Sequence, residues 1–117
     1  MKLSAIAVLA GLSLALVGPG AAAARTSGAQ ATTVKVEATD FKFTLSTKTV
    51  RRGRTTFVIK NAGSAAHDFA IAGHTSKTIG PGKTTRLTVL LKRGRNPYKC
   101  TVDSHAALGM KGVLRVT

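Results

Sequence analysis

The sequence contains few cysteines, few acidic residues and few aromatic side chains. Its 117 residues include one cysteine, four acidic residues, one tyrosine, four phenylalanines and no tryptophan. A single cysteine cannot form a disulfide within the chain, so it is an intermolecular bridge, an inert thiol or a ligand. The scarcity of aromatic rings argues against a nucleic-acid-binding protein, because such proteins stack bases on aromatic side chains.

The sequence also lacks an apolar run of the length, about 20 residues, that a transmembrane helix needs. The N-terminus instead resembles a secretory signal, with Lys2, an apolar stretch at 5–17 and small residues at 22–24. We predict a signal peptide over residues 1–24 and a flexible tail over 25–32, which is rich in serine, glycine and alanine. The remaining residues, 33–117, are predicted to form one domain, exported to the periplasm, the cell envelope or the medium.

Basic residues far outnumber acidic ones. Eighteen lysines and arginines give the chain a net charge of +14, and removal of the signal peptide would take away only Lys2. An exported domain this basic is expected to meet an acidic redox partner or an anionic membrane or envelope surface. The alternative is a solvated basic surface with no particular target. The export signal argues further against nucleic acid as a partner.

Short alternating segments separated by turns predict an all-β domain. The expected strands are 33–39, 41–45, 55–60, 67–71, 84–91, a strand ending at Cys100, and 113–116. Turns are expected at 51–54, 61–64, 80–83 and 94–97, where glycine, proline and asparagine gather. Seven or eight strands without an amphipathic helix indicate an antiparallel β-sandwich, with a small closed barrel as the alternative.

The residues with the most distinctive chemistry lie between positions 100 and 112. Cys100, His105 and Met110 offer a thiolate, an imidazole and a thioether within eleven residues. This donor set suits copper better than zinc, magnesium or calcium, because thioether sulfur binds harder ions poorly. A blue-copper site needs a second imidazole, which we expect from His67. The predicted site is therefore His67, Cys100 and His105 around one copper ion, with Met110 as a weak axial ligand.

Each of these residues taken singly has an ordinary interpretation. A lone buried cysteine is usually inert, and a lone methionine usually fills the core. The combination and its spacing are what indicate a metal site. His74, in the turn after Gly73, is expected to be an ordinary surface residue.

The same residues resemble a known family. They are similar to the C-terminal signature of the cupredoxins, the plastocyanin/azurin family of small blue-copper proteins, in the pattern Tyr98-x-Cys100-x4-His105-x4-Met110-x-Gly112-Val113. The segment Asn61-x-Gly63 before His67 resembles that family's upstream ligand segment. The resemblance covers residues 33–117. It implies an eight-stranded Greek-key sandwich with copper at its loop end, a carrier of single electrons, and His105 as the electron port beside Ala106, Ala107 and Leu108.

Two aspartates depart from the family pattern. Asp68 stands where many members have asparagine, and Asp103-Ser104 stands where many have Pro-Gly. Neither change removes a ligand, so copper is still expected. A carboxylate near the metal favours Cu(II), so each aspartate is expected to lower the reduction potential, and Asp68 more if it points at the Cys100 loop.

Two other functions fit parts of the same pattern. A copper storage or delivery module would use the same four ligands, and a structural sandwich would bind no metal. We expect an electron carrier and not an enzyme, because the sequence shows no acid/base pair for substrate chemistry. We also expect a monomer.

Overall fold

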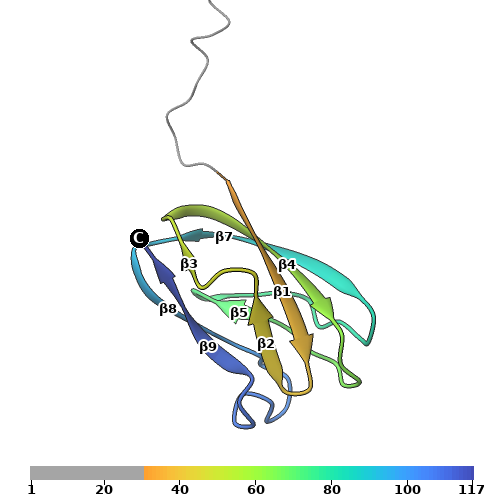
Figure 1. The fold of residues 1–117 in the computed structure, drawn as a ribbon. Helices are drawn as coiled ribbons and strands as arrows, with labels where there is room; N and C mark the ends of the chain where they lie inside the picture. Colours follow the sequence, from red (N-terminus) through yellow and green to blue (C-terminus); the bar gives the residue numbers. More distant parts are fainter. Residues whose placement is uncertain (1–30) are drawn as a thin grey trace, which may run out of the picture.

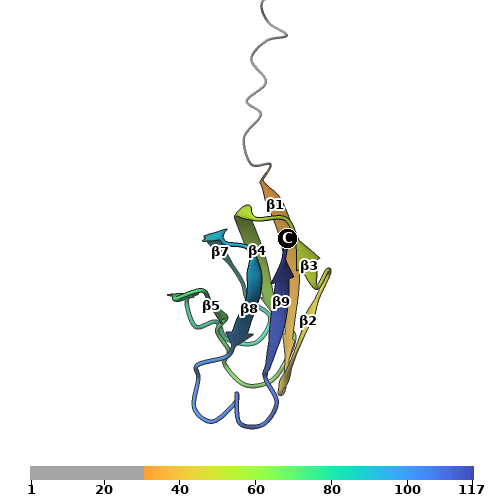
Figure 2. The same cartoon turned by 90° about the vertical axis from the view of Figure 1, so that its left-hand side faces the viewer.

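The computed structural model describes residues 31–117; the predicted signal peptide and most of the predicted tail lie outside these residues. Nine strands form two sheets that pack face to face (Figures 1 and 2). They are β1 (Thr32–Thr39), β2 (Lys42–Leu45), β3 (Thr49–Val50), β4 (Gly53–Asn61), β5 (Ala70–Ile71), β6 (His74–Thr75), β7 (Thr84–Leu91), β8 (Gly94–Lys99) and β9 (Lys111–Val116). Over this part of the chain there is no helix that could cross a membrane.

One sheet has the strand order β2-β1-β4-β7 and the other β3-β9-β8-β5-β6. The predicted all-β sandwich in one domain is confirmed, with nine strands because three of them are only two residues long. Two pairings, β1 with β4 and β3 with β9, are parallel, and the other strand pairs are antiparallel as the sequence indicated. The chain leaves the first sheet for β3 and returns as β4, and this excursion brings β4 beside β1 in the same direction.

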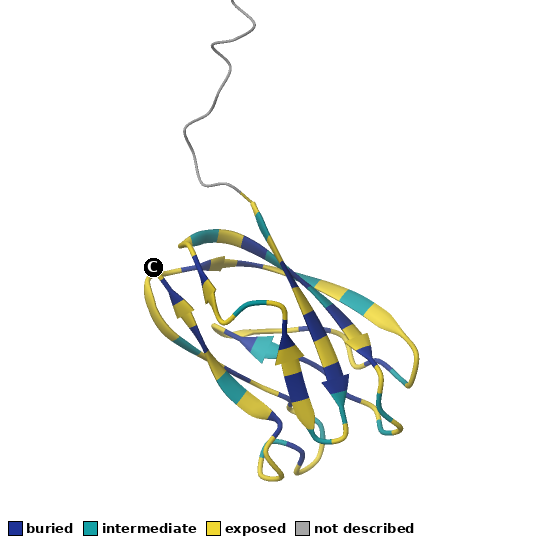
Figure 3. Cartoon of the chain, viewed as in Figure 1, coloured by how far each residue is buried: buried dark blue, intermediate teal, exposed yellow. Residues whose placement is uncertain are grey.

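The core lies between the sheets because the strands alternate. In β1, Val34 and Val36 are buried while Lys35 and Glu37 are exposed, and the same banding runs along the other long strands (Figure 3). Phe69 lies at the centre of an aromatic cluster. Its ring centroid is 5.0 to 5.3 Å from those of three neighbours, Phe57, Phe43 and Tyr98. Because Phe69 is two residues beyond His67, this packing also fixes the His67 segment.

The predicted strand at 67–71 is reduced to the two residues of β5. His67 forms only an isolated bridge with Ile79. The alternating pattern fails here because His67, Asp68 and Phe69 are all buried, so successive side chains do not divide between core and solvent.

The predicted turn at 94–97 was also wrong, because these residues begin β8 and the turn falls at 92–93. Pro97 is compatible with this strand. It pairs with Val113 of β9, and the neighbour on the other side, β5, reaches only Tyr98 and Lys99. No strand therefore pairs with Pro97 on that side, where a missing N–H is tolerated.

Three connections meet at one end of the sandwich: the β1–β2 turn, the segment 62–69 and the loop 100–110 between β8 and β9. In Figure 1 they lie at the lower end, and the C-terminus and the start of β1 lie at the upper end. The residues predicted to bind metal all come from this lower end.

Candidate metal centre

The loop between β8 and β9 is held in a compact shape by its own backbone. The Cys100 N–H donates to the Met110 carbonyl at 3.0 Å, which closes the loop at its base. The Met110 N–H donates to the His105 carbonyl at 3.1 Å. Gly109 adopts a φ of 111°, a conformation that side-chain-bearing residues rarely take, and so allows the chain to turn back before Met110. These bonds place Cys100, His105 and Met110 around one region, as their spacing predicted.

Three of the four predicted ligands present donor atoms to a common point. The Nδ1 atoms of His67 and His105 are 3.2 Å apart, and they lie 3.9 and 3.7 Å from the Cys100 Sγ atom. A triangle with these sides has its centre about 2.1 Å from each corner, close to the length of a bond from a metal ion to imidazole nitrogen or thiolate sulfur. The donor triangle therefore fits a trigonal metal ion without movement of the chain.

The cluster is enclosed. His67, Cys100 and His105 are 0, 1 and 7% exposed, so His105 is the donor nearest to solvent. Burial raises the pKa of the Cys100 thiol above its ordinary value. A bound cation would stabilise the thiolate. Met110 is completely buried in the adjoining core and is linked to Cys100 through their backbones.

Asp40 supports His67 from the side away from the cluster. The second ring nitrogen of His67, Nε2, lies 2.7 Å from the Asp40 carboxylate, which also accepts hydrogen bonds from the N–H groups of Ser64 (2.9 Å) and Ala65 (3.2 Å). The bond from Ser64, followed by that from His67, lowers the pKa of Asp40 from 3.8 to about 2. A carboxylate at Nε2 keeps the proton there and leaves the Nδ1 lone pair facing the cluster.

Asp40 was not among the predicted site residues; the sequence placed it only between the expected strands 33–39 and 41–45. Its position explains one residue of the sequence, Gly63. A Cβ atom at position 63 would lie 2.9 Å from Asp40 Cγ and 3.0 Å from its backbone nitrogen. Glycine is therefore needed for the carboxylate to approach the His67 segment.

Asp68 links the two ligand-bearing segments. Its carboxylate accepts a hydrogen bond of 2.6 Å from the Thr101 N–H and another from the Thr101 hydroxyl. Asp68 thus points at the Cys100 loop. That was the condition under which it is expected to lower the reduction potential more than Asp103. Asp103, in contrast, is exposed and has a φ of 46°. The two aspartates that depart from the family pattern thus lie in different environments.

Phe41 covers both imidazoles. Its ring centroid is 4.7 Å from that of His105 and 6.2 Å from that of His67. The sequence predicted Phe41 as part of an apolar strand face, and its role as a cover was not foreseen. His74 is exposed in β6, as expected, and is not one of the three clustered donors.

Comparison with known proteins agrees with this geometry. The family described as the cupredoxin-like domain matches residues 6–116. The chain belongs to this family. No curated protein matches the sequence.

Among solved structures, this cupredoxin is similar to three auracyanins. The sodium dithionite-reduced auracyanin from the photosynthetic bacterium Roseiflexus castenholzii is 25% identical, with a TM-score of 0.65 over 77% of this chain and 99% of that one. Auracyanin B is 16% identical (TM-score 0.64, 80% and 92% covered). Auracyanin A, a "blue" copper protein from the green thermophilic photosynthetic bacterium Chloroflexus aurantiacus, is 19% identical (TM-score 0.64, 75% and 100% covered). At these low identities, the similarity to auracyanins A and B establishes only the shared fold.

The resemblance to cupredoxins that the sequence indicated is therefore confirmed. The buried cluster of His67, Cys100 and His105, with Met110 beside it, is consistent with a type 1 copper site.

Proposed function

We propose that this cupredoxin is an exported carrier of single electrons that holds one type 1 copper ion. His67, Cys100 and His105 would bind the ion, with Met110 as the axial ligand. The observation that carries the proposal is the donor triangle, whose centre lies at bonding distance from all three donor atoms. Copper supplies the exchange of one electron between Cu(I) and Cu(II).

The chain holds the donors in place through bonds that do not involve a metal. Asn61 is completely buried; its amide nitrogen donates to the carbonyls of Ala65 and Ile79, both at 2.8 Å, and its amide oxygen accepts from the Gly63 N–H. With Asp40 and Asp68, it fixes the segment that carries His67 against the rest of the site. A ligand set held in this way rearranges little when an electron arrives or leaves, which favours a carrier.

His105 is the proposed electron port, because it is the donor nearest to solvent. Ala106 beside it is half-buried, and Ala107 and Leu108 are exposed, with Leu108 58% accessible. These residues give the port a small apolar surface on which a partner can exclude water. Four side chains engaged as ligands would leave no open coordination position for a substrate, which supports a carrier rather than an enzyme.

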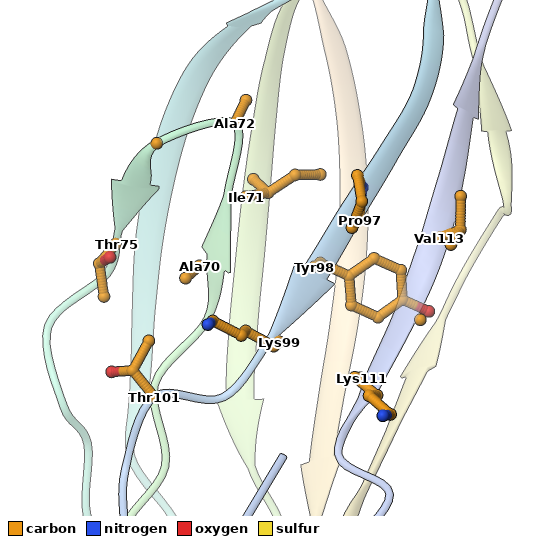
Figure 4. A pocket seen from close by; sticks show the side chains of 12 residues that line it. Ala70, Ile71, Ala72, Thr75, Pro97, Tyr98, Lys99, Thr101, Lys111 and Val113 are labelled. Atoms are coloured by element: carbon orange, nitrogen blue, oxygen red, sulfur yellow. The ribbon is translucent and has the colours of Figure 1, made fainter. Parts of the chain in front are cut away.

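The proposed redox partner is acidic. Lys99 and Lys111 are opposite each other at the ends of β8 and β9, directly before Cys100 and directly after Met110. Together with exposed Pro97 and Val113, both line a groove on the outside of the five-stranded sheet (Figure 4). Two lysines beside the metal loop favour a partner with carboxylates around its own electron port. We propose that the carrier acts as a monomer outside the cytoplasm, in line with the predicted signal peptide.

Voltammetry of the copper-loaded protein tests this function. The proposal requires a reversible one-electron couple, and faster exchange with an acidic than with a basic redox protein at low salt. Tight Cu(I) binding without a reversible couple would contradict the carrier and favour a storage or delivery module.

A further inference from the structure

Basic side chains lie at both ends of the domain, but the acidic ones lie at one end only. All four acidic residues belong to the half that holds the donor cluster: Asp40, Asp68 and Asp103 lie at the cluster end, and Glu37 lies in the half of β1 that leads to it. The opposite end carries eight exposed basic side chains, here called the basic pole: Lys48, Arg51, Arg52, Arg54, Lys92, Arg93, Arg95 and Arg115.

Strand register brings these residues together from β4, β8, β9 and the connecting segments at this end of the domain. The Arg52 N–H donates to the Thr117 carbonyl, and the Arg115 N–H donates to the Lys48 carbonyl. The start of β4 pairs with the end of β7, and the start of β8 pairs with the end of β9. The turns 51–52 and 92–93 therefore lie at the same end as the C-terminus, at the top of Figure 1.

No acidic side chain neutralises the basic pole. Within residues 31–117 no carboxylate lies within ion-pair distance of a lysine or an arginine, and the one such contact to a histidine, between Asp40 and His67, is at the other end of the domain. Arg95 is moreover directly opposite Arg115 in the β8–β9 ladder. Like charges in that position destabilise a sheet. The arrangement thus lowers the stability of the isolated domain, and an anionic surface would relieve it.

An exposed leucine borders the basic pole. Leu90 is 70% exposed, more than any other large apolar side chain in the described chain, and it pairs directly with Arg54 across β4 and β7. A phospholipid bilayer offers phosphate groups to the arginines and an apolar interior to the leucine, whereas a soluble polyanion uses only the charges.

The N-terminal side of the chain joins the domain at this same end. Thr32, the first residue of β1, pairs with Thr55 near the start of β4. The sequence before it contains Arg25 and the apolar stretch 5–17.

We propose that the basic pole docks on a bilayer containing anionic phospholipid, with the donor cluster turned away from the lipid and free to meet redox partners. This inference goes beyond the proposed electron transfer and does not depend on copper. Each lysine or arginine near an anionic bilayer raises the partition coefficient by about fivefold. Loss of three such charges should weaken binding by about a hundredfold.

Sedimentation with lipid vesicles tests the proposal on the native protein and two variants of equal charge. One carries Arg51→Gln, Arg93→Gln and Arg95→Gln in the basic pole. The other carries Lys42→Gln, Lys77→Gln and Lys83→Gln, all exposed residues of the cluster end. With vesicles of phosphatidylcholine and phosphatidylglycerol, the first variant should lose about a hundredfold in binding and the second no more than a few-fold. Vesicles of phosphatidylcholine alone should bind none of the three proteins.

Leu90→Ser separates a bilayer from a soluble polyanion. It should weaken binding to the anionic vesicles and leave binding to immobilised polyphosphate unchanged. Bound vesicles should protect the backbone amides of residues 51–54 and 92–95 from hydrogen exchange and should leave those of residues 101–109 unprotected. Equal losses in the two triple variants, no effect of Leu90→Ser, or protection at the metal loop would each overturn the proposal.

Discussion

Asp68 provides the sharpest test of how the chain tunes its metal site. Its two carboxylate oxygens accept hydrogen bonds from the backbone and the hydroxyl of Thr101, the residue bonded to Cys100. Asparagine at this position keeps the shape and both contacts, because its oxygen accepts from the Thr101 N–H and its amide donates to the hydroxyl oxygen. Asp68→Asn therefore removes a negative charge while the hydrogen-bonded link between the ligand segments stays intact.

The size of the effect follows from Coulomb's law. At a separation of about 8 Å, two unit charges interact by about 2 kcal/mol at an effective dielectric constant of 20. Solvent and salt reduce this to about half, or about 1 kcal/mol. Since 59 mV corresponds to a tenfold change for one electron, the reduction potential should rise by about 40 mV.

Voltammetry measures this shift, and Asp103→Asn is the matched control. Asp103 has the same charge and lies in the loop that carries Cys100, but it is exposed, so its replacement should raise the potential by less than half as much. Copper content and the visible spectrum should stay unchanged in both variants. A shift below about 10 mV for Asp68→Asn, or equal shifts in the two variants, would refute the electrostatic reasoning.

Three further substitutions test other parts of the site and its support. Asp40→Asn should destabilise the protein at neutral pH. Because hydrogen bonds lower the pKa of Asp40 from 3.8 to about 2, the parent's advantage in thermal denaturation should be complete above about pH 5 and should be lost as the pH falls through 2. Gly112→Ala would place a methyl group 2.5 Å from Cζ of Tyr98 and should lower the free energy of unfolding by about 1–3 kcal/mol in denaturant titrations. Gly80→Ala is the control, because a methyl group there would meet no atom within 4 Å and should leave the free energy of unfolding almost unchanged. Met110→Leu should retain copper and blue colour while raising the potential in voltammetry, since a weak thioether bond to Cu(II) is lost.

The local pattern of the sequence predicted most of the fold. The ends of β1 and β7 were predicted to within one residue. Their residues alternate because one face of each strand is buried and the other is solvated, and the turn at 80–83 marks where β7 begins. The parallel pairings of β1 with β4 and of β3 with β9 had no local signal. They depend on where the chain changes sheets, which is a property of the whole packing arrangement.

The candidate site was predictable where its residues are close in sequence. Cys100, His105 and Met110 lie in one loop, and their spacing alone indicated that they converge. The supporting residues were harder to find. Asp40 lies 27 positions from His67, and a carboxylate between two strand patterns is typical of an ordinary turn. Only the packing of the β1–β2 turn against the segment after Asn61 reveals it.

The central claim is that His67, Cys100 and His105, with Met110, bind copper as a type 1 centre. An absorption and EPR spectrum recorded after one equivalent of Cu(II) is added to the apoprotein tests it most directly. The claim predicts an intense visible band from thiolate-to-copper charge transfer and an EPR signal with a small copper hyperfine splitting, both abolished in Cys100→Ser and His67→Ala. A colourless Cu(II) protein, or a Cys100→Ser variant that is still blue, would contradict it.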